Sequence, residues 1–182
     1  MRHTNISRLL PAAIAVAAAI TVTVLGGTAE AQQVAVTSSV APNVYTPGAG
    51  GNPGPNVWVT LPAAVVNIVI PAGQTRLLLA TFSAESACFQ NGGAVPSWCP
   101  VRILFNGVPG APNAGVDFAF DSNASGNAIA TALESHSMQR YKTFTAGEQP
   151  LNVSVVVQRT TTDVNTSIWL DDWTLSVLSL NP

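Results

Sequence analysis

Short apolar runs separated by turn-forming residues are the feature that most constrains the fold of this chain. Leu151 to Val157 alternates apolar and polar residues, which is the pattern of a strand with one buried face. Thr75 to Cys88 and Val101 to Phe105 are further strand candidates, and Asn106-Gly107 is a strong hairpin-turn signal. Ala128 to Phe144 also fits one side of a helix, but it has no convincing cap, so we expect a strand there as well.

The remaining strand candidates complete a pattern that predicts two packed sheets. They are Gln33 to Val40, Val57 to Thr60, Ala64 to Ile70, Val116 to Phe120 and Ser167 to Leu180. About seven to nine strands with turns between them predict an all-β, antiparallel two-sheet sandwich. At this strand number a jelly-roll-like sandwich is favoured over a closed barrel. A parallel α/β fold would need helical runs between the strands, and the sequence contains none.

Residues 1–31 have the pattern of a cleaved secretory signal peptide. Arg2 and Arg8 precede an almost wholly apolar run from Leu9 to Leu25, and Ala29-Glu30-Ala31 presents small residues at the two positions that a signal peptidase reads. The alternative is a retained membrane anchor, because the apolar run reaches the short end of the length that spans a bilayer. The small residues before Gln32 favour cleavage there.

Composition agrees with an exported single-domain protein. Removal of residues 1–31 leaves 151 residues, over which we expect an N-terminal strand and Gly/Pro-rich loop at 32–56 and the sandwich domain at 57–182. These 151 residues carry five Lys or Arg and eight Asp or Glu, a net charge of −3. Such a chain has no electrostatic footprint for nucleic acid or anionic lipid. We expect a secreted, extracellular or periplasmic protein that leaves the membrane after cleavage.

The two cysteines of the chain, Cys88 and Cys99, are predicted to form a disulfide. They are the only cysteines, so a zinc site would need two further ligands nearby, and the spacing does not supply them. An exported protein folds in an oxidising compartment, where such a pair is oxidised. The residues between them, Phe89 to Trp98, include several turn-formers and are expected to form a loop tied at its base.

Three groups of segments carry a resemblance to known proteins. They are Ala84 to Cys88 with Trp98 to Ile103, Asp117 to Ser122 with Glu134 to Ser137, and Leu170 to Trp173. Their pattern resembles a group of uncharacterised secreted bacterial proteins, over about the C-terminal two-thirds of the mature chain. The resemblance implies a β-sandwich domain in an exported bacterial protein. It implies no activity, so no functional residue is carried over from it.

His136 is the only histidine after the leader, so any histidine-dependent nucleophilic site must use it. Ser135 and Ser137 flank it, but in a strand they point to the opposite face and are not its natural partners. The chain also has no G-x-S-x-G nucleophile motif. We therefore expect His136 to be hydrogen-bonded to a neighbouring strand rather than to act as a catalytic base.

Asp171 and Asp172 interrupt an otherwise apolar strand and need a physical reason. Burying an unpaired carboxylate is costly, and the alternation slips at this point, which suggests a bulge that turns one aspartate outward. We expect one of the two to form an ion pair with Arg102, ahead of Arg140 or Arg76. The open alternative is a Ca²⁺ site, since calcium prefers carboxylate oxygens. Further calcium ligands would come from Glu85, Asp117 or Asp121.

The sequence favours a non-enzymatic role. No catalytic or cofactor motif is present, and the aromatic residues Tyr45, Trp58, Trp98 and Tyr141 fall in or near expected loops, where they are candidates for stacking against a ligand. We expect a binding or structural protein whose partner is a carbohydrate or another extracellular protein. The alternative is a secreted hydrolase, in which two Asp or Glu side chains act as acid and base at a set separation.

Cleavage is predicted after Ala31. Intact mass measurement of the exported protein is expected to give an N-terminus at Gln32. Membrane-bound material that still starts at Met1 would identify the leader as an anchor instead.

Overall fold

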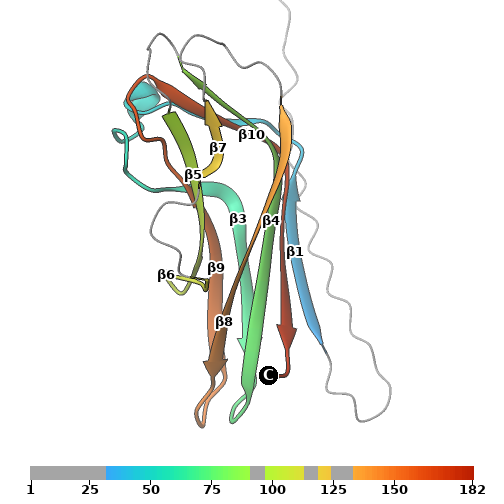
Figure 1. Cartoon of the computed structure of the whole chain (residues 1–182). Coiled ribbons are helices and arrows are strands. Elements are labelled where there is room, and N and C mark those ends of the chain that lie inside the picture. The colour runs from blue at the N-terminus through green and yellow to red at the C-terminus, as the bar shows by residue number, and fades with distance from the viewer. Residues whose placement is uncertain (1–31, 91–96, 113–118, 124–132) are drawn as a thin grey trace, which may run out of the picture.

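The computed structural model describes residues 32–90, 97–112, 119–123 and 133–182, which form an all-β fold of two five-stranded antiparallel sheets (Figure 1). In sheet A the strand order is β1-β10-β4-β8, and β2 also pairs with β10; in sheet B the order is β3-β9-β5-β6, and β7 pairs with β5. The strands are β1 (Gln33–Ser39), β2 (Asn43–Tyr45), β3 (Val59–Ile70), β4 (Thr75–Gln90), β5 (Ser97–Phe105), β6 (Val108–Pro109), β7 (Ala119–Asn123), β8 (Glu134–Thr145), β9 (Leu151–Arg159) and β10 (Thr166–Leu180). A single 3-10 turn, η1 (Ala49–Gly51), lies between β2 and β3.

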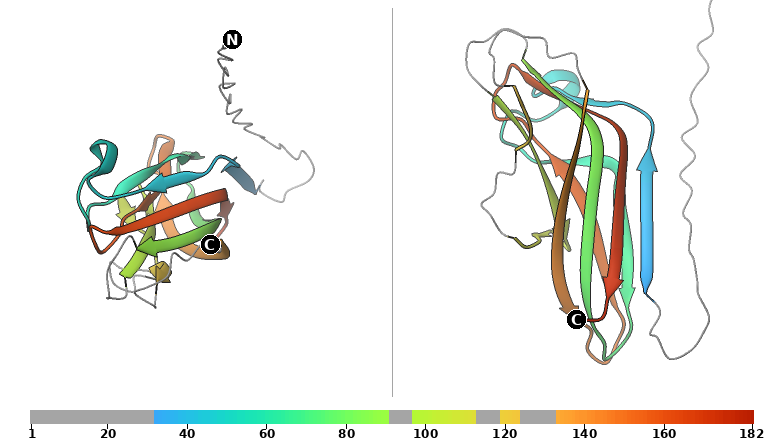
Figure 2. Two further views of the ribbon diagram at one scale, coloured as in Figure 1. Left: turned by 90° about the horizontal axis from the view of Figure 1, so that it is seen from above. Right: turned by 45° about the vertical axis from the view of Figure 1, so that its right-hand side comes forward.

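Strand alternation produces the core between the two sheets, which face each other along their length (Figure 2). In β9, Val153, Val155 and Val157 are fully buried, while the residues between them are partly exposed. In sheet A the core includes Phe82 and Trp173, whose ring centroids lie 6.3 Å apart. Burying a large apolar side chain of this kind contributes about 1.5–3 kcal/mol, so the inter-sheet layer is the main source of stability.

The two-sheet antiparallel sandwich is confirmed, with ten strands where about seven to nine were expected. The additional strands are short. The β2 strand is defined by its pairing with β10, and β6 is defined by its pairing with β5. The β3 strand continues past Pro62 through a register shift between Thr60 and Val65, where Ala63 adopts a φ of 62°. The first three residues of the expected strand from Val116 to Phe120 lie outside the described residues, and its last two belong to β7.

The N-terminal strand is paired into sheet A. The β1 strand pairs with β10 over its whole length, from Gln33 opposite Ser179 to Ser39 opposite Trp173.

Two other expectations from the sequence are confirmed. The long segment from Glu134 to Thr145 is a strand. The Asn106-Gly107 turn joins β5 to β6, with a positive φ at both residues.

The disulfide between Cys88 and Cys99 is present and connects the two sheets. Cys88 lies near the end of β4 in sheet A, and Cys99 lies near the start of β5 in sheet B. Both cysteines are buried. The crosslink therefore holds one end of the sandwich closed.

Replacing both Cys88 and Cys99 by alanine is predicted to lower the free energy of unfolding by about 2–3 kcal/mol, because the closed loop is short and its closure entropy is limited. Chemical denaturation of both forms measures this difference. Non-reducing peptide mapping of the wild-type protein is expected to find the two cysteines in one linked peptide; two alkylatable thiols would contradict the crosslink.

Candidate functional site

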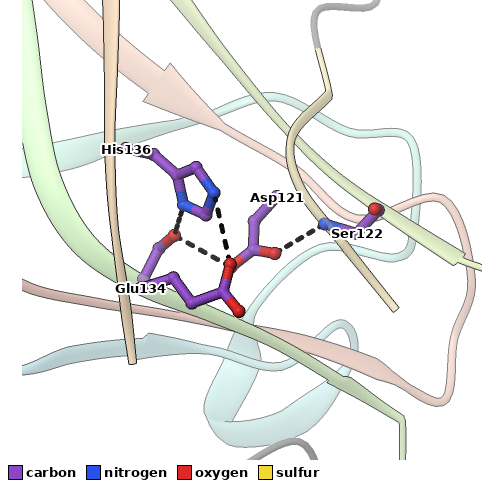
Figure 3. Close-up of polar contacts among 5 residues, drawn as sticks. Asp121, Ser122, Glu134 and His136 are labelled. Atoms are coloured by element: carbon purple, nitrogen blue, oxygen red, sulfur yellow. Dashed lines mark hydrogen bonds and ion pairs between the residues drawn. The ribbon is translucent and has the colours of Figure 1, made fainter. Parts of the chain in front are cut away.

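A polar network joins β4, β7 and β8 at one end of the sandwich (Figure 3). The Ser86 hydroxyl lies 2.8 Å from Asp121 Oδ2 and 2.8 Å from His136 Nδ1. The other imidazole nitrogen of His136, Nε2, lies 3.8 Å from a carboxylate oxygen of Glu134. Asp121 Oδ1 also accepts a hydrogen bond from the backbone N–H of Ser122. One hydroxyl, one imidazole and two carboxylates are thus in one chain of contacts.

Strand register brings these side chains together. Ser86 occupies an inward position of β4, two residues before Cys88, and lies opposite Glu134 of β8. His136 follows on the same face of β8, and the Phe120 ring of β7 packs edge-on against its imidazole with a centroid distance of 5.6 Å. The carboxylate of Glu134 is largely exposed, whereas Ser86 is fully buried.

The direction of the hydrogen bonds follows from proton count. The Ser86 hydroxyl has one proton, which it donates to Asp121, so its oxygen accepts the N–H of His136 Nδ1. A neutral imidazole then presents an unprotonated Nε2 to Glu134.

This network has the composition of a Ser–His–acid triad but not its geometry. In a working triad the serine gives its proton to the imidazole. Here Ser86 is fully buried and its proton is directed to Asp121. His136 is hydrogen-bonded to a neighbouring strand, as expected. Its partner, Ser86, is a residue that the sequence analysis did not single out.

The outer face of sheet A is a second candidate site, because its side chains form rows across four strands. The first row is Val34, Leu178, Leu79 and Tyr141. The next two rows are Val36, Ser176, Thr81 and Gln139, then Ser38, Thr174, Ser83 and Ser137. Gln139 Nε2 donates to Thr81 Oγ1 at 3.1 Å, and Ser83 Oγ donates to Ser137 Oγ at 3.0 Å. We call these three rows the sheet A platform; none of its side chains is charged.

The platform ends at two carboxylates and a bulge. Glu85 of β4 lies directly opposite Asp171 of β10. The register then shifts before Thr174, which confirms the expected bulge, and Asp172 is exposed there with a φ of 42°. The backbone N–H of Asp172 donates to Asp171 Oδ1 at 2.9 Å. The aspartates are accommodated by exposure and local hydrogen bonding.

The expected ion pair between Arg102 and Asp171 or Asp172 is not formed. Arg102 lies in sheet B and the two aspartates lie in sheet A. Arg102 Nε and Nη2 both donate to Gln158 Oε1, at 3.0 and 2.7 Å, from the neighbouring strand. The guanidinium also stacks over the Trp58 ring, 4.1 Å from its centroid. A cross-strand amide and an aromatic ring replace the predicted carboxylate.

The four aromatic candidates for ligand stacking have different environments. Tyr45 is fully buried and its hydroxyl donates to Pro53 O at 3.1 Å, so stacking by Tyr45 was a wrong expectation. One face of Trp58 is covered by a guanidinium. Trp98 is 52% exposed on β5, and Tyr141 is 46% exposed on the sheet A platform. Trp98 and Tyr141 are the two that are open to a ligand.

A calcium site is not assembled within the described ranges. No three His, Cys, Asp or Glu side chains come together there in an arrangement that could hold a metal ion. Asp117, one of the expected ligands, lies outside these ranges. In the same part of the chain, no helix is long and apolar enough to cross a membrane.

Comparison with known proteins gives no assignment: no family model matches the chain, and neither does any curated protein. The site must therefore be interpreted from its own geometry.

Replacing Ser86 by alanine is predicted to lower the free energy of unfolding by about 1–2 kcal/mol, because Asp121 and His136 both lose a hydrogen-bond partner at a partly buried position. The matched control is Ser83→Ala, which removes an outward hydroxyl of the same strand and is expected to change stability by less than about 0.5 kcal/mol. Urea denaturation compares the two. Equal effects would show that the network adds no stability.

Proposed function

We propose that this protein is a secreted, non-enzymatic binding protein that recognises a neutral polysaccharide through the sheet A platform. The observation that carries the proposal is the make-up of the platform: uncharged, part apolar and part hydroxyl and amide, with the exposed ring of Tyr141 at one edge. Sugar rings have apolar C–H faces and hydroxyl edges. A surface with an apolar row beside rows that carry hydroxyl and amide groups therefore complements a neutral sugar chain.

Each side chain of the platform has a role in this proposal. The ring of Tyr141 stacks against a sugar face, which aromatic side chains do at low entropic cost. Gln139 and Thr81 hydrogen-bond sugar hydroxyls from the next row. Leu79 and Leu178 provide the apolar floor. The absence of charge on these rows disfavours an acidic polymer as the ligand, because nothing there would neutralise its charge.

The strand order supports a jelly-roll assignment within the proposal. From β3 onward the long strands β3, β4, β5, β8, β9 and β10 alternate between sheets B and A along the chain. Such double-sheet folds include lectin domains. This is an analogy of fold, and fold alone does not determine function, so the platform carries the argument. Secretion enters the proposal through the leader pattern and the disulfide.

Tyr141→Ala is predicted to weaken binding to a neutral polysaccharide about 3–10-fold, the loss expected for one aromatic contact. Affinity electrophoresis on cellulose, xylan and polygalacturonate measures it, and the acidic polygalacturonate is expected to bind poorly. The matched control is Trp98→Ala, which removes an exposed aromatic away from the platform and is expected to leave binding unchanged. Loss of binding in Trp98→Ala alone would place the ligand on sheet B.

A secreted hydrolase is the second candidate, and one observation favours it. Asp121 and Glu134 are two carboxylates in contact with the Ser86–His136 pair, Asp121 through the Ser86 hydroxyl and Glu134 through the imidazole. A hydrolase would use one as acid and the other as base. Turnover on a polysaccharide panel that is abolished by Glu134→Gln, but retained by the exposed-loop variant Glu148→Gln, would establish this candidate and overturn the non-enzymatic one.

A further inference from the structure

The edge of sheet A at β1 has none of the features that normally protect an edge strand. Native proteins use charges, prolines and bulges to prevent another strand from adding to an open edge. The opposite edge, β8, carries glutamate, arginine and lysine side chains and is bridged by Ala111 at Tyr141. The edge of sheet B at β3 is interrupted by Pro62 and the register shift around it. The β1 strand has no charge, no proline and an unbroken register with β10.

The hydrogen-bond pattern of sheet A shows which backbone groups of β1 face this edge. The N–H and C=O of Tyr141 both bond to Ala111, so they point away from β4. This direction alternates along an antiparallel strand, so the registers β8–β4, β4–β10 and β10–β1 determine it for β1 as well. Val34, Val36 and Ser38 are the residues whose N–H and C=O point away from β10. In the described ranges no strand pairs with them on that side.

The position of β1 leaves this edge accessible in the plane of sheet A. The strand lies at the margin of the described fold (Figure 2). Sheet B contacts β1 from its inner side, where the hydroxyl of Thr37 donates to Ala63 O of β3 at 3.4 Å. The outward side chains of β1 belong to the sheet A platform.

The edge-facing groups of β1 are complementary to those of a second copy in antiparallel register. A two-fold axis through Ala35 places Val34 of one copy opposite Val36 of the other. It also places Gln32, which continues the alternation before β1, opposite Ser38. Both are pairs of edge-facing residues, so each exchanges two N–H···O=C bonds across the interface. Such a contact uses the same surface on both copies and therefore closes as a dimer.

The side chains at this edge also favour a second copy as the partner. Val34 and Val36 point outward, and each is 42% exposed. In the register above, each of these valines meets the other valine of the second copy, and the cross-strand pair buries apolar surface. No like charges are brought together, because neither β1 nor the sheet A platform carries a charge.

We propose that the mature protein forms a two-fold dimer through β1, in which the two A sheets join into one continuous sheet. The axis of an antiparallel strand pair is perpendicular to the sheet, so both platforms face the same side. The platform row that begins at Val34 continues into the row that begins at Val36 of the second copy. The joined surface suits a long polymer. Only this last consequence rests on the proposed function, and the dimer does not depend on it.

Sedimentation equilibrium of the exported protein tests the dimer. One strand pair is a small interface, so we expect a dissociation constant on the order of 100 µM and a mainly dimeric wild type at about 500 µM. Val36→Lys is expected to raise the dissociation constant at least about 10-fold, because the valine pairs are lost and the two lysines lie diagonally across the axis. Its exposed position retains the fold. Val69→Lys, the same change at an exposed valine of β3, is the matched control and is expected to dimerise as the wild type does.

Oxidative crosslinking tests the register. On the axis the two copies of Ala35 form a non-hydrogen-bonded pair with Cα atoms about 4.5 Å apart, which is within the range of a disulfide. Ala35→Cys is therefore expected to give a covalent dimer under mild oxidation. Ser38→Cys is the matched control, because its two copies lie at opposite ends of the strand pair, and it is expected to stay uncrosslinked. If Ala35→Cys does not fold, Val36→Lys still decides the question.

Three outcomes would overturn the dimer. They are a wild type that is monomeric at about 500 µM, an association that Val36→Lys leaves unchanged, and dissociation by Val69→Lys alone, which would place the contact on β3. Polysaccharide binding is measured separately. A monomer that binds a neutral polysaccharide overturns the dimer and supports the platform, whereas a dimer that binds none supports the dimer and overturns the platform.

Discussion

The pairing of β4 with β10 is the constraint on which the rest of the structure depends. These two strands lie side by side from Gln90 opposite Thr166 to Leu77 opposite Leu180, with a single interruption at the bulge after Asp171. Because side chains alternate along each strand, one register sets both faces at once. It directs Phe82 into the core and the platform residues outward. A shift of one residue would exchange the two sets.

The interior of the sandwich is apolar in its middle and polar at the end closed by the disulfide. The valines of β9 give way to Arg159, and Cys88 is flanked in β4 by Ser86 and Gln90. The favourable free energy of apolar burial in the middle offsets the cost of burying polar groups at this end. These polar groups differ in their hydrogen bonding. The Ser86 hydroxyl contacts both Asp121 and His136, whereas the Gln90 amide and Arg159 Nε and Nη1 have no hydrogen-bond partner within the described residues.

Sequence pattern predicted what depends on neighbours along the chain. Alternation identified β9, the presence of only two cysteines in a chain with an export leader identified the crosslink, and the slip in phase identified the bulge at Asp171. It failed where partners come from distant strands. Arg102 is matched by Gln158 because β5 pairs with β9, which no local pattern reveals.

The same limit applies to the aromatic and hydroxyl candidates. Tyr45 belongs to a short strand that is defined only by its pairing with β10, so its burial was not visible in the sequence. The contact of Ser86 with His136 and Asp121 requires β4, β7 and β8 to meet.

The position of β10 in sheet A also has a consequence for folding. It lies between β1 and β4, yet every other strand of the described fold precedes it in the chain. Until β10 is in place, β1 has no partner in sheet A and β4 exposes an open edge, to which another chain can add. Sheet A is therefore complete only once its last strand has inserted, and until then a folding chain presents this edge to other copies of itself.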